Sequence, residues 1–301
     1  DLHYPLRRQR QMCIRDRSRI SNGDGMKFLS SAKINLNLEV NSETKDGLHT
    51  LTSYLIPIDF YDVIEINETD EKNDKIIFTP DIELKGKSTI EKSLDLVRES
   101  NSFEKYFEVK VTKNIPIEGG LGGGSSNAGS IIKYICSTYD LALPKNEDIA
   151  KKVGSDVPYF IEGKPGVISG IGEEVSIDES IGDLDILIAT PHEKISTVDA
   201  FQAFDKLGDK NQFKKSKIKN MEIFNNMWNP ALAIEPRLQD HKDHLEEVFN
   251  IDFYMSGTGS TLFGIGEYDN LENSIKKVDK TRFRLIKITK KIDCSLLFNA
   301  D

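Results

Sequence analysis

The feature that most constrains the fold is a run of glycines directly before an apolar segment with helical spacing. Five of the six residues in 119–124 are glycine, and the sixth is Leu121. Glycines let backbone N–H groups approach a ligand closely, and the following Ser125 and Ser126 are good N-caps for a helix expected over about 126–139. A helix N-terminus offers free N–H groups and a partial positive charge, which favour phosphate. The pattern therefore predicts a phosphate-binding loop, with a flexible loop before a helix as the plainer alternative.

Two common phosphate-binding motifs do not fit this loop. A P-loop carries a lysine directly before its Ser or Thr, and no lysine precedes Ser125. The dinucleotide motif G-x-G-x-x-G also fails, because its third glycine falls on Ser125 when counted from Gly120 and on Asn127 when counted from Gly122. The loop therefore belongs to neither class.

Because the overall charge is negative, any phosphate must be bound by local groups. The 301 residues carry a formal net charge of −9, which argues against a general nucleic-acid-binding protein. No run of about 18 apolar residues occurs, so we expect no membrane span. Cys13, Cys136 and Cys294 lie far apart and form no CxxC pair. That spacing indicates neither a disulfide framework nor a zinc site, and it favours a reducing cytoplasm.

The first 25 residues differ from the rest in composition. They contain six arginines and no lysine, whereas the remaining 276 residues contain four arginines and 30 lysines. The segment has no apolar core like that of a secretory signal, and it is a poor match to a transit peptide, which would direct the chain to a plastid. We interpret residues 1–25 as an extraneous or disordered leader, with Met26 as the natural start. A nucleic-acid-binding arm is the alternative.

Alternation of apolar and polar residues gives the clearest secondary-structure signal. Every second residue from Ala32 to Val40 is apolar, which predicts a strand over 28–40. Strands dominate the first third and helices intermix later, which predicts an α+β fold with two lobes sharing a cleft. Further strands are expected over 51–66 with a break at Pro57, 76–84, 108–112, within 165–188, on both sides of a turn in 253–267, and over 284–289. Helices are expected over 90–107, 126–139, 147–153, 197–206, 216–227, 238–249 and 270–279.

Three further patterns carry groups that suit phosphate chemistry. Lys33 and Asn35 lie two apart on the expected strand, so both side chains point into one space. An exposed strand face is the alternative. Residues 255–260, Met-Ser-Gly-Thr-Gly-Ser, form either a plain hairpin turn or a second loop that closes over phosphates. Asp156 precedes Pro158 and is either a general base or a helix N-cap.

Together these motifs resemble the GHMP kinase superfamily in their order and spacing. Within it, the chain is most similar to the kinases that act on a cytidine-diphosphate-linked methylerythritol. The resemblance covers residues 26 to about 295. It rests on Ala32-Lys-Ile-Asn-Leu36, Asp46-Gly-Leu-His-Thr-Leu51, Gly-Gly-Leu-Gly-Gly-Gly-Ser-Ser-Asn-Ala at 119–128, Gly154-Ser-Asp-Val-Pro-Tyr-Phe160 and Asn229-Pro-Ala-Leu-Ala-Ile-Glu-Pro236.

The resemblance implies a fold and a reaction. The implied fold has an ATP-binding N-terminal lobe at 26–168, similar to domain 2 of ribosomal protein S5, and an α/β C-terminal lobe at 169–301, with the active site in the cleft. The implied reaction is ATP-dependent phosphorylation of the 2-hydroxyl of the cytidine-diphosphate-linked substrate, in the non-mevalonate route to isoprenoid precursors. The implied cofactors are ATP and Mg²⁺, and the implied assembly is a monomer or homodimer that binds neither nucleic acid nor membrane.

The resemblance implies roles for the residues of this chain that stand at matching positions of the family motifs. The implied catalytic cluster is Lys33, Asn35 and Asp156, of which Asn35 and Asp156 also contact the substrate. His49 would bind the cytosine, and Ser126 or Ser125 would touch Mg²⁺. The implied ATP-phosphate site comprises Gly119, Gly120, Leu121, Gly122, Gly123, Gly124, Ser125, Ser126, Gly257, Thr258 and Gly259.

One position departs from the family pattern. The residue before the histidine is commonly a tyrosine that stacks on cytosine, and here it is Leu48. We keep Leu48 as a substrate-binding residue and expect Phe201 or Phe204 to stack from the opposite lobe. The alternatives are a GHMP kinase for mevalonate or homoserine and a catalytically silent binding protein. His49 argues against the first, because those substrates carry no nucleobase, and retention of Lys33 and the loop glycines argues against the second.

Overall fold

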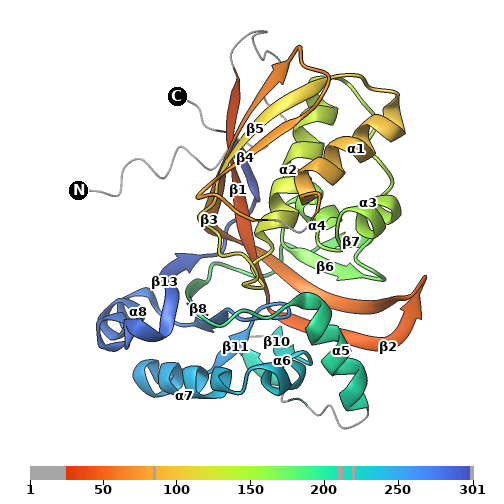
Figure 1. Cartoon of the computed structure of the whole chain (residues 1–301). Coiled ribbons are helices and arrows are strands. Elements are labelled where there is room, and N and C mark those ends of the chain that lie inside the picture. Colours follow the sequence, from red (N-terminus) through yellow and green to blue (C-terminus); the bar gives the residue numbers. More distant parts are fainter. Residues whose placement is uncertain (1–24, 84–85, 209–212, 214, 219–220, 299–301) are drawn as a thin grey trace.

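The large sheet is built on one long hairpin (Figure 1). The computed structural model describes residues 25–298 apart from 84–85, 209–212, 214 and 219–220. β1 (Met26–Asn35) and β2 (Asn37–Lys45) form the first arm, and β3 (Leu48–Thr69) forms the second arm, antiparallel to both. The first arm is interrupted at Leu36, whose N–H donates to the Tyr54 carbonyl at 2.9 Å. The predicted strand over 28–40 is therefore present as two strands.

β3 continues through Pro57, where the sequence predicted a break. Pro57 is paired with Lys33 of β1, and its carbonyl accepts a hydrogen bond from the Ile292 N–H at 3.0 Å. A proline lacks the N–H donor, but its carbonyl is still hydrogen-bonded. The irregularity lies beside it instead, where the register with β3 shifts between Ser31 and Ala32.

The other strands of the large sheet join this hairpin at its edges. β5 (Tyr106–Thr112) and β6 (Gly166–Ser169) pair antiparallel with different parts of β3, and each is extended by one strand, β4 (Lys75–Thr79) beside β5 and β7 (Glu174–Ile177) beside β6. On the other side, β14 (Leu296–Phe298) pairs with β1, and β10 (Met221–Asn225) runs parallel to β2 with β9 (Ser216–Ile218) beyond it. Strands from both ends of the chain thus complete one sheet.

A second sheet packs against the hairpin. Its strands are β8 (Asp185–Pro191), β11 (Phe253–Met255), β12 (Leu262–Ile265) and β13 (Phe283–Lys290), antiparallel in the order β11-β12-β8-β13. The even-numbered residues Ala32, Ile34 and Leu36 are buried against Ile188 and Phe263 of this sheet. Because strand side chains alternate between faces, Lys33 and Asn35 lie on the opposite face.

Helices cover the two sheets separately (Figure 1). α1 (Thr89–Asn101), α2 (Gly123–Thr138), α3 (Asn146–Lys152) and α4 (Val157–Glu162) pack on the end of the large sheet that carries β4 and β5, around a shared apolar core. α5 (Thr197–Leu207), α6 (Trp228–Ile234), α7 (Arg237–Phe249) and α8 (Tyr268–Ser274) lie with the second sheet, and 3₁₀ turns η4 (Ile275–Lys277) and η5 (Lys280–Arg282) follow α8. The α+β prediction is confirmed.

The prediction of a helix over 216–227 is wrong. The described part of this segment forms β9 and β10, because β10 pairs with β2, far away in the sequence. Ile223 and Phe224 are buried there, so pairing and burial override the local helical spacing. The helix expected over 90–107 ends at Asn101, where Ser102 adopts a left-handed conformation, and α4, α6 and β14 were not predicted.

The lobe boundary expected between residues 168 and 169 stays a prediction. It falls inside β6, and β10 and β14 return after it to the large sheet. The predicted leader lies outside the described residues apart from Gly25. Within the described chain, no helix is long and apolar enough to cross a membrane.

Candidate active site

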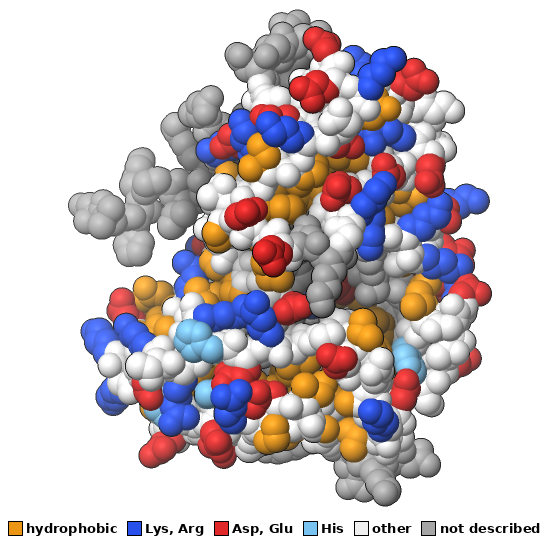
Figure 2. Space-filling view, viewed as in Figure 1, with side chains coloured by type: hydrophobic (Ala, Val, Ile, Leu, Met, Phe, Trp, Pro, Cys, Tyr) orange, Lys and Arg blue, Asp and Glu red, His pale blue; other side chains and the backbone are white. Residues whose placement is uncertain are grey.

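A cavity of about 540 Å³ lies where the glycine loop meets β1 and the two-glycine turn after β11. Its walls include most of the glycine loop, Lys33, Asn35, Asp156 and residues 257–259. Figure 2 shows acidic and basic side chains interspersed over the face of the molecule that it displays. This pattern agrees with the expectation that local groups, rather than a positive surface, hold any phosphate.

The glycine loop leads directly into α2 and needs its glycines. Gly120 has φ +73°, and a Cβ there would lie 2.0 Å from the Ser256 carbonyl oxygen. Gly122 also has a positive φ, and a Cβ on it would lie 3.0 Å from side-chain carbons of Lys33. Only glycine fits this conformation without strain. The loop is therefore pressed against both β1 and the second glycine turn.

The two serines after the loop are not the N-caps that the sequence predicted. α2 begins at Gly123, three residues earlier than expected, and Gly122 occupies the N-cap position without a side-chain cap. The left-handed conformation of Gly122 allows the helix to start inside the glycine run. The first-turn N–H groups of a helix have no intrahelical acceptor, and in α2 they belong to the glycine loop itself and to Ser125.

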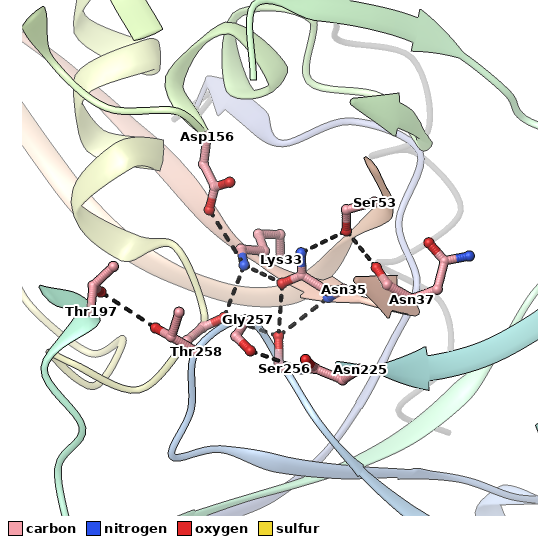
Figure 3. A network of polar contacts seen from close by, with 11 residues as sticks. Lys33, Asn35, Asn37, Ser53, Asp156, Thr197, Asn225, Ser256, Gly257 and Thr258 are labelled. Atoms are coloured by element: carbon pink, nitrogen blue, oxygen red, sulfur yellow. Dashed lines mark hydrogen bonds and ion pairs between the residues drawn. The ribbon is translucent and has the colours of Figure 1, made fainter. Parts of the chain in front are cut away.

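Lys33 is the central cation of the site (Figure 3). Its side chain is only 3% exposed, and its ammonium donates to the Asn35 side-chain oxygen and, at 3.0 Å, to the Gly120 carbonyl. Its Nζ also lies 3.4 Å from the Asp156 carboxylate. A buried charge is stable only when it is paired and hydrogen-bonded, and these contacts meet that condition.

Asp156 stands at the start of α4 but does not cap it. It occupies the N-cap position before Pro158, yet its side chain makes no cap hydrogen bond. The carboxylate points to Lys33 and is 23% exposed, on the wall of the cavity. Its position therefore leaves it accessible to a molecule in the cavity.

A polar network fixes Asn35 and the second glycine turn (Figure 3). The Asn35 amide donates to Ser53 Oγ at 2.8 Å, and the Asn35 backbone N–H donates to Ser256 Oγ at 3.2 Å. Ser256 Oγ donates in turn to the Gly120 carbonyl at 2.9 Å, which ties the turn to the glycine loop. Asn225 Nδ2 donates to the carbonyls of Met255 and Gly257 at 2.7 and 2.8 Å.

Ser53, Asn225 and Ser256 were not predicted as site residues from the sequence. Ser256 lies within the glycine turn that was recognised, so its position carried a signal. Asn225 lies in the segment 216–227, which was wrongly predicted to be a helix, so its contact with the glycine turn could not be expected. Thr258 was predicted as a site residue. Its hydroxyl oxygen lies 3.3 Å from the hydroxyl oxygen of Thr197, at the start of α5.

His49 lies beside two aromatic rings of α5. The ring of Phe201 is stacked on it at 5.4 Å and 13°, and the ring of Phe204 meets it edge-on at 5.6 Å. Its Nδ1 is 2.8 Å from the Asn41 carbonyl, and its Nε2 is 3.1 Å from an Asp205 carboxylate oxygen. Phe201 lines the cavity. His49 stacks on Phe201 and is not itself a lining residue. Leu48 is 43% exposed.

The two serines proposed for Mg²⁺ lie in different surroundings. Ser126 is fully buried, with its Oγ 2.6 Å from Ser30 Oγ. Ser125 lines the cavity and lies near the segment that leads to Asp156, since a Cβ on Gly154 would be 3.6 Å from Ser125 Oγ. The geometry therefore favours Ser125. Among the residues that the structure describes, no group of three or more His, Cys, Asp or Glu could hold a metal ion.

Comparison with known proteins identifies the family of the chain. The family model described as the GHMP kinases N terminal domain matches residues 88–164. A 4-diphosphocytidyl-2-C-methyl-D-erythritol kinase of Clostridium tetani is 31% identical over 288 residues, which cover 89% of this chain and 100% of that protein. A kinase of the same name from a Sulfurihydrogenibium species is 32% identical over 250 residues, covering 79% and 90%. The chain belongs to the 4-diphosphocytidyl-2-C-methyl-D-erythritol kinase family.

Solved structures with a similar fold identify the architecture of this chain. A crystal structure of 4-(cytidine 5'-diphospho)-2C-methyl-D-erythritol kinase matches with a TM-score of 0.71 and 20% identity, covering 88% of this chain and 99% of that one. A homoserine kinase from Cytophaga hutchinsonii matches with a TM-score of 0.63 and 14% identity, covering 94% and 100%. The GHMP kinase fold is therefore confirmed. Fold alone does not separate the kinases of this superfamily, because the same architecture serves several alcohol substrates.

Proposed function

We propose that this chain is the kinase that phosphorylates the 2-hydroxyl of 4-(cytidine 5'-diphospho)-2-C-methyl-D-erythritol with ATP, in the non-mevalonate route to isoprenoid precursors. The proposal is supported by membership of the family and by one observation in particular. A buried lysine, a partly exposed carboxylate and a glycine loop at a helix N-terminus meet at one cavity. That combination provides a proton acceptor, a fixed cation and a phosphate cradle.

Asp156 acts as the general base. Its carboxylate accepts the proton of the substrate 2-hydroxyl as that oxygen attacks the γ-phosphorus of ATP, and the bond between the γ-phosphorus and the β,γ-bridging oxygen breaks to release ADP. A positioned general base contributes about 10²–10⁴-fold to the rate. The lack of a side-chain cap on α4 leaves the carboxylate free for this role.

Lys33 and the glycine loop stabilise charge during transfer. The Lys33 ammonium faces both Asp156 and the loop, so it attracts the developing alkoxide and the phosphoryl oxygens. The loop N–H groups at the start of α2 bind the phosphates of ATP. Asn35 holds Lys33 in place through its side-chain oxygen and is itself held by Ser53. Phosphoryl transfer depends mainly on this kind of positioning and charge stabilisation.

The residues present fit a magnesium ion that is held chiefly by nucleotide phosphates. Ser125 and Asp156 both line the cavity and carry side-chain oxygens, and Ser125 Oγ lies near Gly154, two residues before Asp156. Bound there, Mg²⁺ would neutralise part of the phosphate charge. We propose Ser125 rather than Ser126 as its hydroxyl ligand, because Ser126 Oγ is turned to Ser30.

The cytidine part of the substrate binds at the apolar part of the cavity wall. Leu38, Val40, Leu51 and Phe201 line the cavity and belong to one apolar cluster, and His49 stacks on Phe201. A nucleobase is planar and carries hydrogen-bonding edges, so an aromatic ring and a histidine suit it. With Leu48 in place of the usual tyrosine, Phe201 supplies the aromatic face.

One assay tests the proposed substrate. ADP release is measured with cytidine-diphosphate-linked methylerythritol, mevalonate and homoserine side by side, with Asp156→Asn as the control for contaminating kinases. We expect turnover only with the cytidine substrate, and loss of it in Asp156→Asn. Turnover of mevalonate or homoserine instead would contradict the proposal and assign the chain to another branch of the superfamily. Binding of ATP without turnover of any alcohol would indicate a silent binding protein.

A further inference from the structure

Asp62 of β3 is a buried carboxylate that the proposed reaction does not use. It is fully buried, and both of its oxygens are occupied. Oδ1 accepts hydrogen bonds from the backbone N–H groups of Asn114 and Ile115 at 2.8 and 2.9 Å. Oδ2 accepts from the Lys113 ammonium and, at 3.1 Å, from the Asn127 amide. One side chain thus joins β3 to the segments on both sides of the glycine loop.

Lys113 brings this cluster to the wall of the active-site cavity. Its side chain is nearly buried, and the residue lines the cavity together with the glycine loop. A Cβ on Gly123, the first residue of α2, would lie 3.0 Å from Lys113 Nζ. The ammonium therefore lies against the first turn of the helix whose N-terminus forms the phosphate cradle. Asn127, in the next turn, also lines the cavity.

The contacts fasten the glycine loop at both of its ends. Asn114 and Ile115 lead into the loop and are fixed through their backbone, whereas Asn127 follows it and is fixed through its side chain. Without the carboxylate, two buried N–H groups, an amide and an ammonium would compete for acceptors that the interior does not provide. The loop entrance and the Lys113 ammonium would then shift together.

We propose that Asp62 is a positioning residue for nucleotide binding, which holds Lys113 and the glycine loop in the arrangement that receives the phosphates of ATP. This inference rests on the proposed function, because it places ATP in the cavity. Asp62 is shielded from the cavity and acts through Lys113 and the loop backbone. Its effect is therefore expected on the affinity for ATP rather than on proton transfer or on the cytidine substrate.

The test compares Asp62→Asn with Glu65→Gln. Both changes remove one carboxylate from β3, but Glu65 is partly exposed and forms an ion pair with Lys27, away from the cavity lining. In Asp62→Asn the new amide oxygen still accepts from Asn114 and Ile115, while its NH₂ group faces the Lys113 and Asn127 donors. We expect KM for ATP to rise about 10-fold or more, with KM for the cytidine substrate within about 2-fold. Glu65→Gln should leave both values unchanged.

A second variant and a binding measurement keep the test decisive. Lys113→Gln retains a donor for Asp62 but removes the charge, and it should also raise KM for ATP selectively if Asp62→Asn fails to fold. The affinity for a non-hydrolysable ATP analogue, measured by calorimetry with Mg²⁺ and without any alcohol, should fall in parallel. A lower melting temperature with unchanged ATP affinity would make Asp62 merely structural and overturn the inference. Wild-type protein that binds the analogue but does not phosphorylate the cytidine substrate would contradict the proposed function alone.

Discussion

The Lys33 ammonium and the Asp156 carboxylate lie 3.4 Å apart, one nearly buried and the other open to the cavity. The buried partner is held by Asn35 and Gly120, so its position does not depend on Asp156 alone. The partly exposed partner, Asp156, is therefore the one that we propose as the proton acceptor. The difference in exposure supports different proposed roles, a fixed cation for Lys33 and a general base for Asp156.

Asp156→Asn is expected to lower kcat by about 10²-fold or more, because an amide cannot accept the proton. The melting temperature and the affinity for ATP should change little, since the Asp156 side chain caps no helix. Steady-state kinetics and a thermal melt measure these quantities on one preparation. A variant with near-normal kcat would show that the base lies elsewhere.

Gly120→Ala should damage both stability and ATP binding. Its left-handed φ costs a residue with a side chain about 1–3 kcal/mol, and the new Cβ would collide with the Ser256 carbonyl. Gly182→Ala is the matched control, because a Cβ there would meet no atom within 4 Å. It should change the free energy of unfolding by no more than about 0.5 kcal/mol. Equal effects in denaturant titrations of the two variants would contradict the close approach of loop and turn.

Ser125→Ala and Ser126→Ala should differ in their response to Mg²⁺. Loss of a ligand hydroxyl in Ser125→Ala is expected to raise the Mg²⁺ concentration for half-maximal activity about 3-fold or more. Ser126→Ala loses a buried hydrogen bond to Ser30 and should cost about 1 kcal/mol of stability, with no change in the Mg²⁺ requirement. Magnesium titrations at saturating ATP, together with thermal melts, separate the two. The reverse pattern would restore Ser126 as the ligand.

His49→Ala should weaken the cytidine substrate selectively. The change removes the ring on which Phe201 is stacked and the partner of Asp205. We expect a cost of about 1–3 kcal/mol, or roughly 5- to 150-fold, in KM for the cytidine substrate. KM for ATP serves as the internal reference and should stay constant. Parallel increases in both KM values would mean that His49 supports the fold and does not belong to the nucleobase site.

The sequence was most informative where a local pattern determines geometry. The alternation from Ala32 to Val40 assigned one face of the strand to the core, and that assignment left Lys33 and Asn35 on the other face. The glycine run predicted a loop of unusual backbone conformation, which the positive φ values of Gly120 and Gly122 show. Both signals lie within a few residues of the feature they specify.

Features that depend on distant partners could not be predicted in this way. β10 is a strand because β2 lies beside it, and the local spacing of residues 216–227 resembled a helix. Asp62 is one acidic residue in a strand of mixed polarity, and its importance follows only from the N–H groups that the segment after β5 brings to it. The start of α2 at Gly123 likewise depends on the packing of Gly122 against Lys33, which no helix-cap preference encodes.

The topology of the large sheet has a consequence for how the protein forms during translation. β1, which carries Lys33 and Asn35, is synthesised well before its neighbour β14, because Phe28 of β1 pairs with Phe298 of β14. Non-local pairings of this kind slow folding, because a long loop must close before they form. While the ribosome is still elongating the chain, the edge of β1 is therefore uncovered and open to pairing with other strands. The strand that carries Lys33 therefore gains its second neighbour only after β14 has emerged.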